Sequence, residues 1–362
     1  QKVLDAMIPY FTEKFGNPSS GQHQFGTIAK KVIIESKKNI KNFINTNEGD
    51  ILFTSGATES INLALRGLTA SNRIQGNHII TTRTEHKAVL DTCQVLEKDG
   101  IELTYLSVDK NGLIDINELI ECIKPETILI SILWANNETG VIQKMKKISE
   151  IAQDHEVLLM SDTTQALGKI EIDLDKTPVD LFTFSGHKIY GPKGIGGLYF
   201  SDNALLSNIV PQITGGGQQR GLRSGTLNTP GIVGLSKSVE ILNEQMTAEQ
   251  DRIRQLRDYF ESQLIDVSGK IRINCESSQR LPNTSNVAFL GHDFEEIILR
   301  NKKLAFSSGS ACNSATIEAS HVLRAMNLPE EYLHGSVRFS FGRFTTQEEV
   351  DFAVKELKRN NL

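Results

Sequence analysis

Short apolar runs alternate with segments of helical spacing between about residue 50 and residue 200. Runs of this length and composition predict buried strands, and the amphipathic segments between them predict helices. Such an alternation predicts an α/β fold in which a mainly parallel sheet has helices on both faces. The predicted strands are Ile51–Phe53, His78–Thr82, Ile128–Leu133, Val157–Met160 and Leu181–Phe184.

The pattern changes in the C-terminal third of the chain. Residues 231–264 have continuous helical spacing with charge on the outer face, which predicts a long helix that bridges to a second domain. Two short predicted strands, Asn286–Leu290 and Ser336–Ser340, are mixed with helical segments. We therefore expect a large domain at residues 1–245 and a smaller α+β domain at 246–362, as the length also favours.

Composition excludes several classes of partner. Lys plus Arg is 39 and Asp plus Glu is 44, a net charge of -5. This balance gives no electrostatic reason to expect nucleic acid or an anionic membrane as the main partner. No apolar run approaches membrane-spanning length, and no signal peptide opens the sequence. The sequence begins with Gln1, and we expect further residues to precede it.

The four cysteines, Cys93, Cys122, Cys275 and Cys312, include no C-x-x-C pair. In a chain of this length without an export signal, they predict reduced thiols and a cytoplasmic location. The segment Asp109–Asp115 faintly resembles a calcium loop, but its glycine comes too early for one. We therefore predict no metal site.

Candidate chemistry is concentrated where the predicted strands end. Leu181–Phe184 is followed by Ser-Gly-His-Lys, which places Lys188 at the mouth of a buried strand. Burial there would lower the pKa of the amine and make it a nucleophile towards carbonyl groups. The preceding strand leads into Asp162, and a lysine and an aspartate from neighbouring strand ends suit pyridoxal phosphate. The alternative is a solvated loop lysine.

Three other strand ends carry candidates, each with a structural alternative. Thr58 is the predicted N-cap of a helix whose free N–H groups would bind phosphate, unless the segment is an ordinary turn. His86 would stack on a planar ring and move protons, or it has a structural role. Asn136 and Asn137 would bind a carboxylate or a phenolic oxygen, or they cap the turn.

Two loops and one strand complete the candidates. The glycine-rich loop at residues 215–226 would hold a phosphate or gate a site, or it is an exposed connection. Small polar residues surround Cys312, which predicts an accessible loop with a reactive thiol. Arg338, on a predicted strand, would bind a substrate carboxylate with its guanidinium, or it forms a surface salt bridge.

Together these segments resemble the pyridoxal-phosphate-dependent cysteine desulfurases, in the NifS/IscS-like group with a long cysteine loop, within the class-V aminotransferases. The resemblance implies PLP-dependent transferase fold type I, with a mainly parallel seven-stranded sheet in the large domain and the cysteine loop in the small one. The matching blocks are in family order and span nearly the whole chain: Gly16–Ser20, Thr54–Asn62, Glu85–Val89, Asn136–Glu138, Asp162–Gln165, Ser185–Lys188, Arg220–Leu227, Ser307–Cys312 and Ser336–Phe344.

The resemblance also implies roles for individual residues. Lys188 is similar to the lysine that forms the Schiff base, Cys312 to the cysteine that carries the persulfide, and His86 to the catalytic histidine that stacks on the ring. Asp162 would pair with the pyridine nitrogen and Gln165 with the phenolic oxygen. The implied phosphate contacts are Ala57, Thr58, Ser185, His187 and, from the other subunit, Thr226; the implied substrate contacts are Asn137 and Arg338.

The reaction that the resemblance implies converts L-cysteine to L-alanine. The sulfur would pass to Cys312 as a persulfide and then to an acceptor protein, for iron–sulfur cluster assembly, tRNA thiolation or DNA phosphorothioation. A homodimer is implied as well. The alternatives are an aminotransferase or a selenocysteine lyase of the same fold, or a sulfur carrier without enzymatic activity. The family usually opens with a strand containing Asn-Ala-Thr-Thr, which we expect to precede Gln1.

Overall fold

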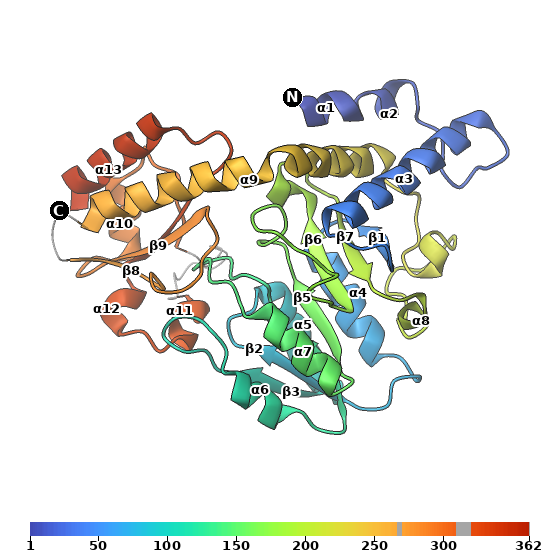
Figure 1. The fold of residues 1–362 in the computed structure, drawn as a ribbon, viewed down its shortest axis with the longest axis horizontal. Coiled ribbons are helices and arrows are strands. Elements are labelled where there is room, and N and C mark those ends of the chain that lie inside the picture. Colours follow the sequence, from blue (N-terminus) through green and yellow to red (C-terminus); the bar gives the residue numbers. More distant parts are fainter. Residues whose placement is uncertain (266–269, 309–319, 362) are drawn as a thin grey trace.

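The computed structural model describes residues 1–265, 270–308 and 320–361 (Figure 1). The strands are β1 (Asp50–Thr54), β2 (His78–Thr82), β3 (Glu102–Leu106), β4 (Thr127–Ser131), β5 (Leu158–Asp162), β6 (Leu181–Ser185), β7 (Gly196–Phe200), β8 (Ile271–Ile273), β9 (Thr284–Phe289) and β10 (Ser336–Ser340). The α-helices are α1 (Lys2–Met7), α2 (Pro9–Thr12), α3 (Gln24–Phe43), α4 (Ala57–Thr69), α5 (Lys87–Lys98), α6 (Ile116–Cys122), α7 (Met145–Asp154), α8 (Asn203–Leu206), α9 (Thr229–Ile265), α10 (Phe294–Arg300), α11 (His321–Ala325), α12 (Glu330–Leu333) and α13 (Gln347–Asn361). Two short 3-10 helices are η1 (Gly186–Ile189) and η2 (Gln219–Gly221).

Seven strands form one sheet in the order β1-β7-β6-β5-β4-β2-β3. Strands β2 to β6 pair in parallel, whereas β7 runs antiparallel to both β1 and β6. The predicted mainly parallel sheet is therefore confirmed. All five strands predicted for this sheet are present, although β4 ends at Ser131 and not at Leu133. The two strands predicted in the C-terminal third are present as β9 and β10. The strands β3, β7 and β8 were not predicted.

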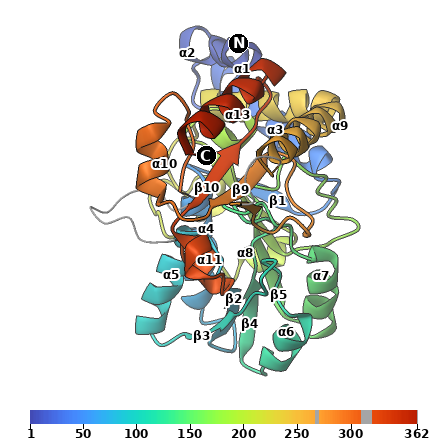
Figure 2. The same ribbon diagram turned by 90° about the vertical axis from the view of Figure 1, so that its left-hand side faces the viewer.

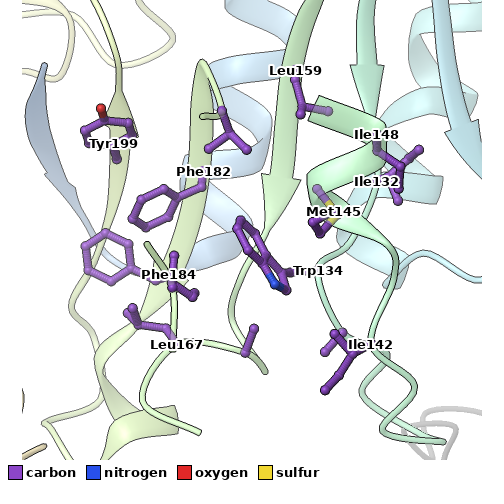
Figure 3. Close-up of a cluster of buried hydrophobic side chains, with 14 of the residues drawn as sticks. Ile132, Trp134, Ile142, Met145, Ile148, Leu159, Leu167, Phe182, Phe184 and Tyr199 are labelled. Atoms are coloured by element: carbon purple, nitrogen blue, oxygen red, sulfur yellow. The ribbon is translucent and has the colours of Figure 1, made fainter. Parts of the chain in front are cut away.

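Both faces of this sheet are buried, which explains why its strands read as continuous apolar runs. Along β6, Phe182 and Phe184 belong to the core cluster on one face, and Leu181 belongs to the cluster on the other. Figure 3 shows Phe182 beside Phe184 and Tyr199, and its ring is stacked on that of Tyr199 at a centroid distance of 5.1 Å. Helices α5 and α7 cover opposite faces (Figure 2).

The helix α9 has 37 residues, which corresponds to a length of about 55 Å. Its first half contributes Ile232 and Leu235 to the core of the large sheet, and its second half contributes Phe260 and Leu264 to a separate core. Figure 1 shows the helix running from one part of the molecule to the other, so the predicted bridging helix is confirmed. The domain boundary at 245/246 falls inside α9 and stays a prediction.

The second core lies under a smaller antiparallel sheet with the order β10-β9-β8. In this sheet Arg338 of β10 lies opposite Asn286 of β9. The helices α10 and α13 contribute side chains to the same core, which agrees with the predicted α+β composition. No helix in the described part of the chain is long and apolar enough to cross a membrane.

Candidate active site

A cavity of about 320 Å³ opens at the carboxyl ends of β5 and β6, where open α/β sheets bind their ligands. It brings together ten of the predicted site residues: Ala57, Thr58, His86, Asn137, Asp162, Gln165, Ser185, His187, Lys188 and Arg338. Thr226 is exposed and does not line it, and Cys312 lies outside the described residues. A larger cavity of about 610 Å³ beside α3 contains none of these side chains, so we take the smaller one as the site.

The carboxylate of Asp162 is held at the end of β5. Strand β5 pairs in parallel with β6, and Asp162 lies opposite Thr183. Its Oδ1 accepts hydrogen bonds from the Thr164 N–H at 2.9 Å and from the Thr183 hydroxyl at 3.3 Å. These bonds fix the carboxyl group and leave Oδ2 without a protein donor among the described residues. Oδ2 is therefore available to a positively charged ring nitrogen.

The amine of Lys188 is carried by η1, which follows β6 directly. Burial lowers the pKa of Lys188, the nearby Arg338 guanidinium lowers it further, and Asp162 opposes both effects. The amine therefore loses its proton more easily than that of a solvated lysine. A base and nucleophile thus lies in the same cavity as the Asp162 carboxylate.

The N-terminus of α4 lies at the edge of the cavity without a side-chain cap of its own. The helix begins at Ala57 after the N-cap residue Gly56, so the prediction of Thr58 as the N-cap is wrong. The reason is that Ser185 of β6 supplies the capping oxygen from outside the helix, because its Oγ accepts from the Ala57 N–H at 2.8 Å. A helix start beside this hydroxyl suits a phosphate group.

His86 both caps α5 and lines the cavity. Its Nδ1 accepts from the Ala88 N–H at 3.1 Å, which leaves the proton of the neutral ring on Nε2. Burial lowers the pKa of His86, with Asp162 opposing and Lys188 adding to the effect. The structural role of His86 as a helix cap is therefore confirmed, and the ring also lines the cavity. Its stacking on a planar ring and its part in proton transfer stay predictions.

The paired asparagines have different positions. Asn136 is buried and caps the turn, since its Oδ1 accepts from the N–H groups of Glu138 and Thr139 at 2.8 and 2.9 Å. Asn137 faces the cavity, and its carbonyl oxygen accepts from Arg338 Nη1 at 2.8 Å. The Nε of Arg338 is buried and has no partner among the described residues. Burial also lowers the pKa of Arg338, and Glu138 opposes this effect.

Five further polar residues line the cavity that the sequence did not single out as site residues: Lys87, Glu138, Thr164, Ser307 and His321. Glu138 directly follows the paired asparagines, so its position was a usable signal. Burial raises its pKa, and its carboxyl group accepts from the Ser320 hydroxyl. His321 Nε2 is 3.0 Å from the Glu85 carbonyl oxygen, a contact across 236 positions that no local pattern could reveal.

The loop at residues 215–226 is attached to the large sheet. The side-chain amide of Gln219 pairs with the Phe53 backbone at the sheet edge, accepting from its N–H at 2.7 Å and donating to its carbonyl at 2.8 Å. Arg223 forms a 2.7 Å ion pair with Glu59 of α4. The alternative that this loop is an exposed connection is therefore incomplete, because Gln219 and Arg223 attach the loop to β1 and α4. The predicted contact of Thr226 with another subunit stays a prediction.

Three cysteines fall within the described residues, and all three are free thiols, as predicted. Burial raises the pKa of Cys93 and of Cys275 to about 12 in each case. Burial also raises the pKa of Cys122. Because the thiolate is the reactive form, none of the three is suited to act as a nucleophile near neutral pH.

Comparison with known proteins agrees with this geometry. A family model described as "Aminotransferase class-V" matches residues 1–352. The cysteine desulfurase IscS of Methylococcus capsulatus is 46% identical over 357 residues, which cover 99% of this chain and 88% of that protein. A NifS-like protein of known structure has a TM-score of 0.91 at 34% identity, covering 99% of this chain and 95% of that one.

A second solved structure, SspA in complex with cysteine, has a TM-score of 0.82 at 36% identity, covering 96% of each chain. These likenesses confirm the predicted α/β architecture of fold type I. The family model and the relatives match nearly every residue of this chain. The chain therefore belongs to the class-V aminotransferase family and, within it, to the cysteine desulfurases.

Proposed function

We propose that this protein is a pyridoxal-phosphate-dependent cysteine desulfurase that converts L-cysteine to L-alanine and transfers the sulfur to Cys312. The observation that carries the proposal is the position of Lys188 and Asp162, which follow or end adjacent strands and line one cavity. An amine of lowered pKa and a carboxylate with a free oxygen are the two groups that this cofactor needs from a protein.

The residues that line the cavity fit the cofactor at each of its polar groups. Lys188 would hold the aldehyde carbon, and Asp162 would accept the hydrogen bond of the ring nitrogen. The N-terminus of α4, with Ser185 and His187 beside it, would hold the phosphate. His86 would lie against the ring face. A volume of about 320 Å³ is within the range of small-molecule sites, about 300–1,000 Å³.

When bound, pyridoxal phosphate supplies an electron sink for the bonding pair that the substrate Cα–H bond releases. The protein groups hold and move the proton. Lys188 Nζ, with its lowered pKa, would take the proton from Cα once the substrate amine has displaced it. The Asp162 carboxylate favours a protonated ring nitrogen, because an anion stabilises the neighbouring positive charge.

The substrate carboxylate would bind to Arg338 and Asn137. The guanidinium Nε has no partner within the described residues, and the Nη1 contact with the Asn137 carbonyl fixes its direction. A buried guanidinium without a bound carboxylate recognises anions through charge-assisted hydrogen bonds. The related SspA, which was solved in complex with cysteine, supports this amino acid as the substrate.

Sulfur transfer would use the thiolate of Cys312. Its attack on the substrate sulfur forms an S–S bond and breaks the Cβ–S bond of the substrate. The bonding pair stays with Cβ, which is protonated to the methyl group of alanine, so no external oxidant is needed. The raised pKa values of the other three cysteines support Cys312 as the thiol that reacts.

The persulfide would then pass to an acceptor protein. A homodimer is part of the proposal, because Thr226 is exposed in its own subunit and lies outside the cavity that it would serve. The free thiols of Cys93, Cys122 and Cys275 support a reducing, cytoplasmic location. We also propose that the large domain covers residues 1–245 and the small one 246–362.

The experiment combines a visible spectrum with product analysis. Protein incubated with pyridoxal phosphate should acquire a visible absorbance band and form alanine from L-cysteine. The variant Cys312→Ser should keep the band and lose sulfide release in the presence of a thiol reductant, whereas the control Cys122→Ser should lose neither. Full sulfide release by Cys312→Ser would contradict the persulfide step, and exchange with a keto acid without alanine formation would indicate an aminotransferase.

A further inference from the structure

A second lysine, Lys169, lies close to the proposed cofactor site and has no assigned role. It follows β5 in a tight turn that passes through Gly168, whose φ is +74°. A side chain at Gly168 would lie 2.7 Å from Leu242 and 2.9 Å from Ile189, so the turn requires glycine. The turn directs the amine of Lys169 back towards the residues that follow β5.

The amine of Lys169 donates a hydrogen bond to Oε1 of Gln165 at 2.6 Å. Lys169 forms no ion pair with any described residue, and its charged neighbours, Lys188 and Arg338, are both cations. Burial first, and then these two cations, lower the pKa of Lys169 to about 7. The side chain as a whole is half-buried, but the amine is at its desolvated end. A buried ammonium group without a described counter-ion is not expected to stabilise the fold.

The contact determines which end of the Gln165 amide faces the cavity. In its protonated form the Lys169 amine donates hydrogen bonds and accepts none, so the ammonium group can only face the amide oxygen. Gln165 lines the cavity, and with Oε1 bound to Lys169 the Nε2 group is the end available there. The opposite orientation would place two donors against each other at Lys169 and present an oxygen to the cavity.

We propose that Lys169 is a positioning residue that fixes the side-chain amide of Gln165 so that Nε2 donates to the phenolic oxygen of bound pyridoxal phosphate. This inference rests on the proposed function and adds to it a residue outside the cavity lining. A hydrogen bond donated to the phenolic oxygen stabilises the negative charge of that oxygen. The oxygen then stabilises a proton on the neighbouring Lys188 Nζ, when this atom is bonded to the cofactor, less strongly. Loss of the orientation should therefore raise the pH at which that nitrogen loses its proton.

The test follows the visible absorbance band of the bound cofactor against pH, without substrate. In Lys169→Met the midpoint should rise by about half to one pH unit, the equivalent of one neutral hydrogen bond. Lys169→Arg should stay near the wild-type midpoint, because a guanidinium also donates without accepting. Gln165→Ala should raise the midpoint, and Lys169→Met added to Gln165→Ala should change it no further.

Two outcomes would overturn the inference. One is a Lys169→Met protein that binds the cofactor with the wild-type midpoint, and the other is a shift that persists in full on the Gln165→Ala background. If Lys169→Met does not fold, Lys169→Gln replaces it, because an amide can donate or accept and so removes the orientation. A wild-type protein without a visible band would reject the proposed function itself, which separates the two failures.

Discussion

The cavity is built from two regions that contribute different kinds of groups. The carboxyl ends of β5 and β6 in the seven-stranded sheet carry Asp162 and Lys188. The edge of the three-stranded sheet carries Arg338, and the adjoining segments carry Ser307 and His321. The first region holds the groups that would bear on the cofactor, and the second holds groups that suit the substrate.

The two regions also differ in what holds their residues in place. Asp162 and Lys188 depend on parallel strand pairing and on a core buried on both faces. Arg338 is held at the cavity by individual contacts between the part of the chain around the three-stranded sheet and the part around the seven-stranded sheet. Examples are its hydrogen bond to the Asn137 carbonyl and the isolated β-bridge between Val141 and Arg280. We therefore expect the first region to determine reactivity and the second to determine substrate binding. Four predictions test this difference.

The largest expected effect is that of Lys188→Ala. Removing the amine that is proposed to take the Cα proton should lower kcat for alanine formation by about 10³–10⁴-fold, and the visible band of the proposed cofactor should change. Lys193→Ala, at an exposed lysine five positions later, is the matched control. Alanine release and the absorbance spectrum are the measurements. A Lys188→Ala protein with the wild-type band and turnover would contradict the expectation that the first region determines reactivity.

The next effect concerns the attachment of the second region. Arg280 and Glu261 are 5% and 8% exposed, and they form two hydrogen bonds at 2.7 and 2.9 Å between α9 and the segment before β9. Glu261→Gln leaves a buried guanidinium without its counter-ion, which should lower the free energy of unfolding by about 3–5 kcal/mol. Urea denaturation of the variant and the wild type measures this difference in the free energy of unfolding.

The control for that change is Glu244→Gln, at an exposed position on the same helix. The Glu261→Gln protein should keep its cofactor band at temperatures where it is folded, because the bond lies outside the cavity. Equal unfolding free energies for Glu261→Gln and Glu244→Gln would show that the ion pair does not hold the second region in place.

The same difference explains what could be predicted from the sequence. Phe182 and Phe184 mark β6 because both faces of the strand are buried, and the polar residues after it mark the site. Strand β7 escaped prediction because it opens with two glycines. A side chain at Gly197 would lie 2.5 Å from Phe184, so close packing and not β propensity selects this residue.

Long-range contacts were the part that the sequence could not supply. The cap of α4 comes from Ser185, 128 positions away, so local capping preferences pointed to Thr58 instead. His321 is separated from its Glu85 partner by 236 positions, and no pattern near either residue reports the contact. The sequence singled out Arg338 as a candidate for binding a carboxylate, but its strand alone was also compatible with a surface salt bridge. The family resemblance favoured the first alternative.

The third prediction concerns Arg338→Met and sharpens the assignment of substrate binding. Loss of the proposed charge-assisted hydrogen bond from Arg338 to the substrate carboxylate should raise KM for L-cysteine by about 10- to 100-fold, with a smaller change in kcat. Arg272→Met, at an exposed arginine of the same sheet, is the control. Steady-state kinetics measure both constants. A large loss in kcat with unchanged KM would instead place Arg338 with the reactive groups of the first region.

The smallest effect is a pH dependence of stability that arises within the first region. Burial raises the pKa of Glu85 well above its usual range, and the Asp162 charge adds to this effect. Glu85 Oε1 accepts from the Leu133 N–H at 2.5 Å, and Oε2 has no partner among the described residues. A carboxyl group with a raised pKa in the folded state binds its proton more tightly there than in the unfolded chain. The stability that this difference contributes is fully present below the ordinary Glu pKa of about 4.3 and is lost as the pH rises through the folded-state pKa.

Glu85→Gln keeps the acceptor for Leu133 and cannot ionise, so the variant should lack this loss. Its free energy of unfolding relative to the wild type should increase between pH 5 and pH 8 by on the order of 1 kcal/mol. Urea denaturation at a series of pH values measures the difference, and Glu121→Gln, at an exposed side chain, is the matched control for removal of one carboxylate. A difference that is constant over this range, or that falls with pH, would mean that Glu85 is ionised in the folded protein. The first region would then hold two carboxylates side by side, and Asp162 would no longer be the single negative charge offered to the ring nitrogen.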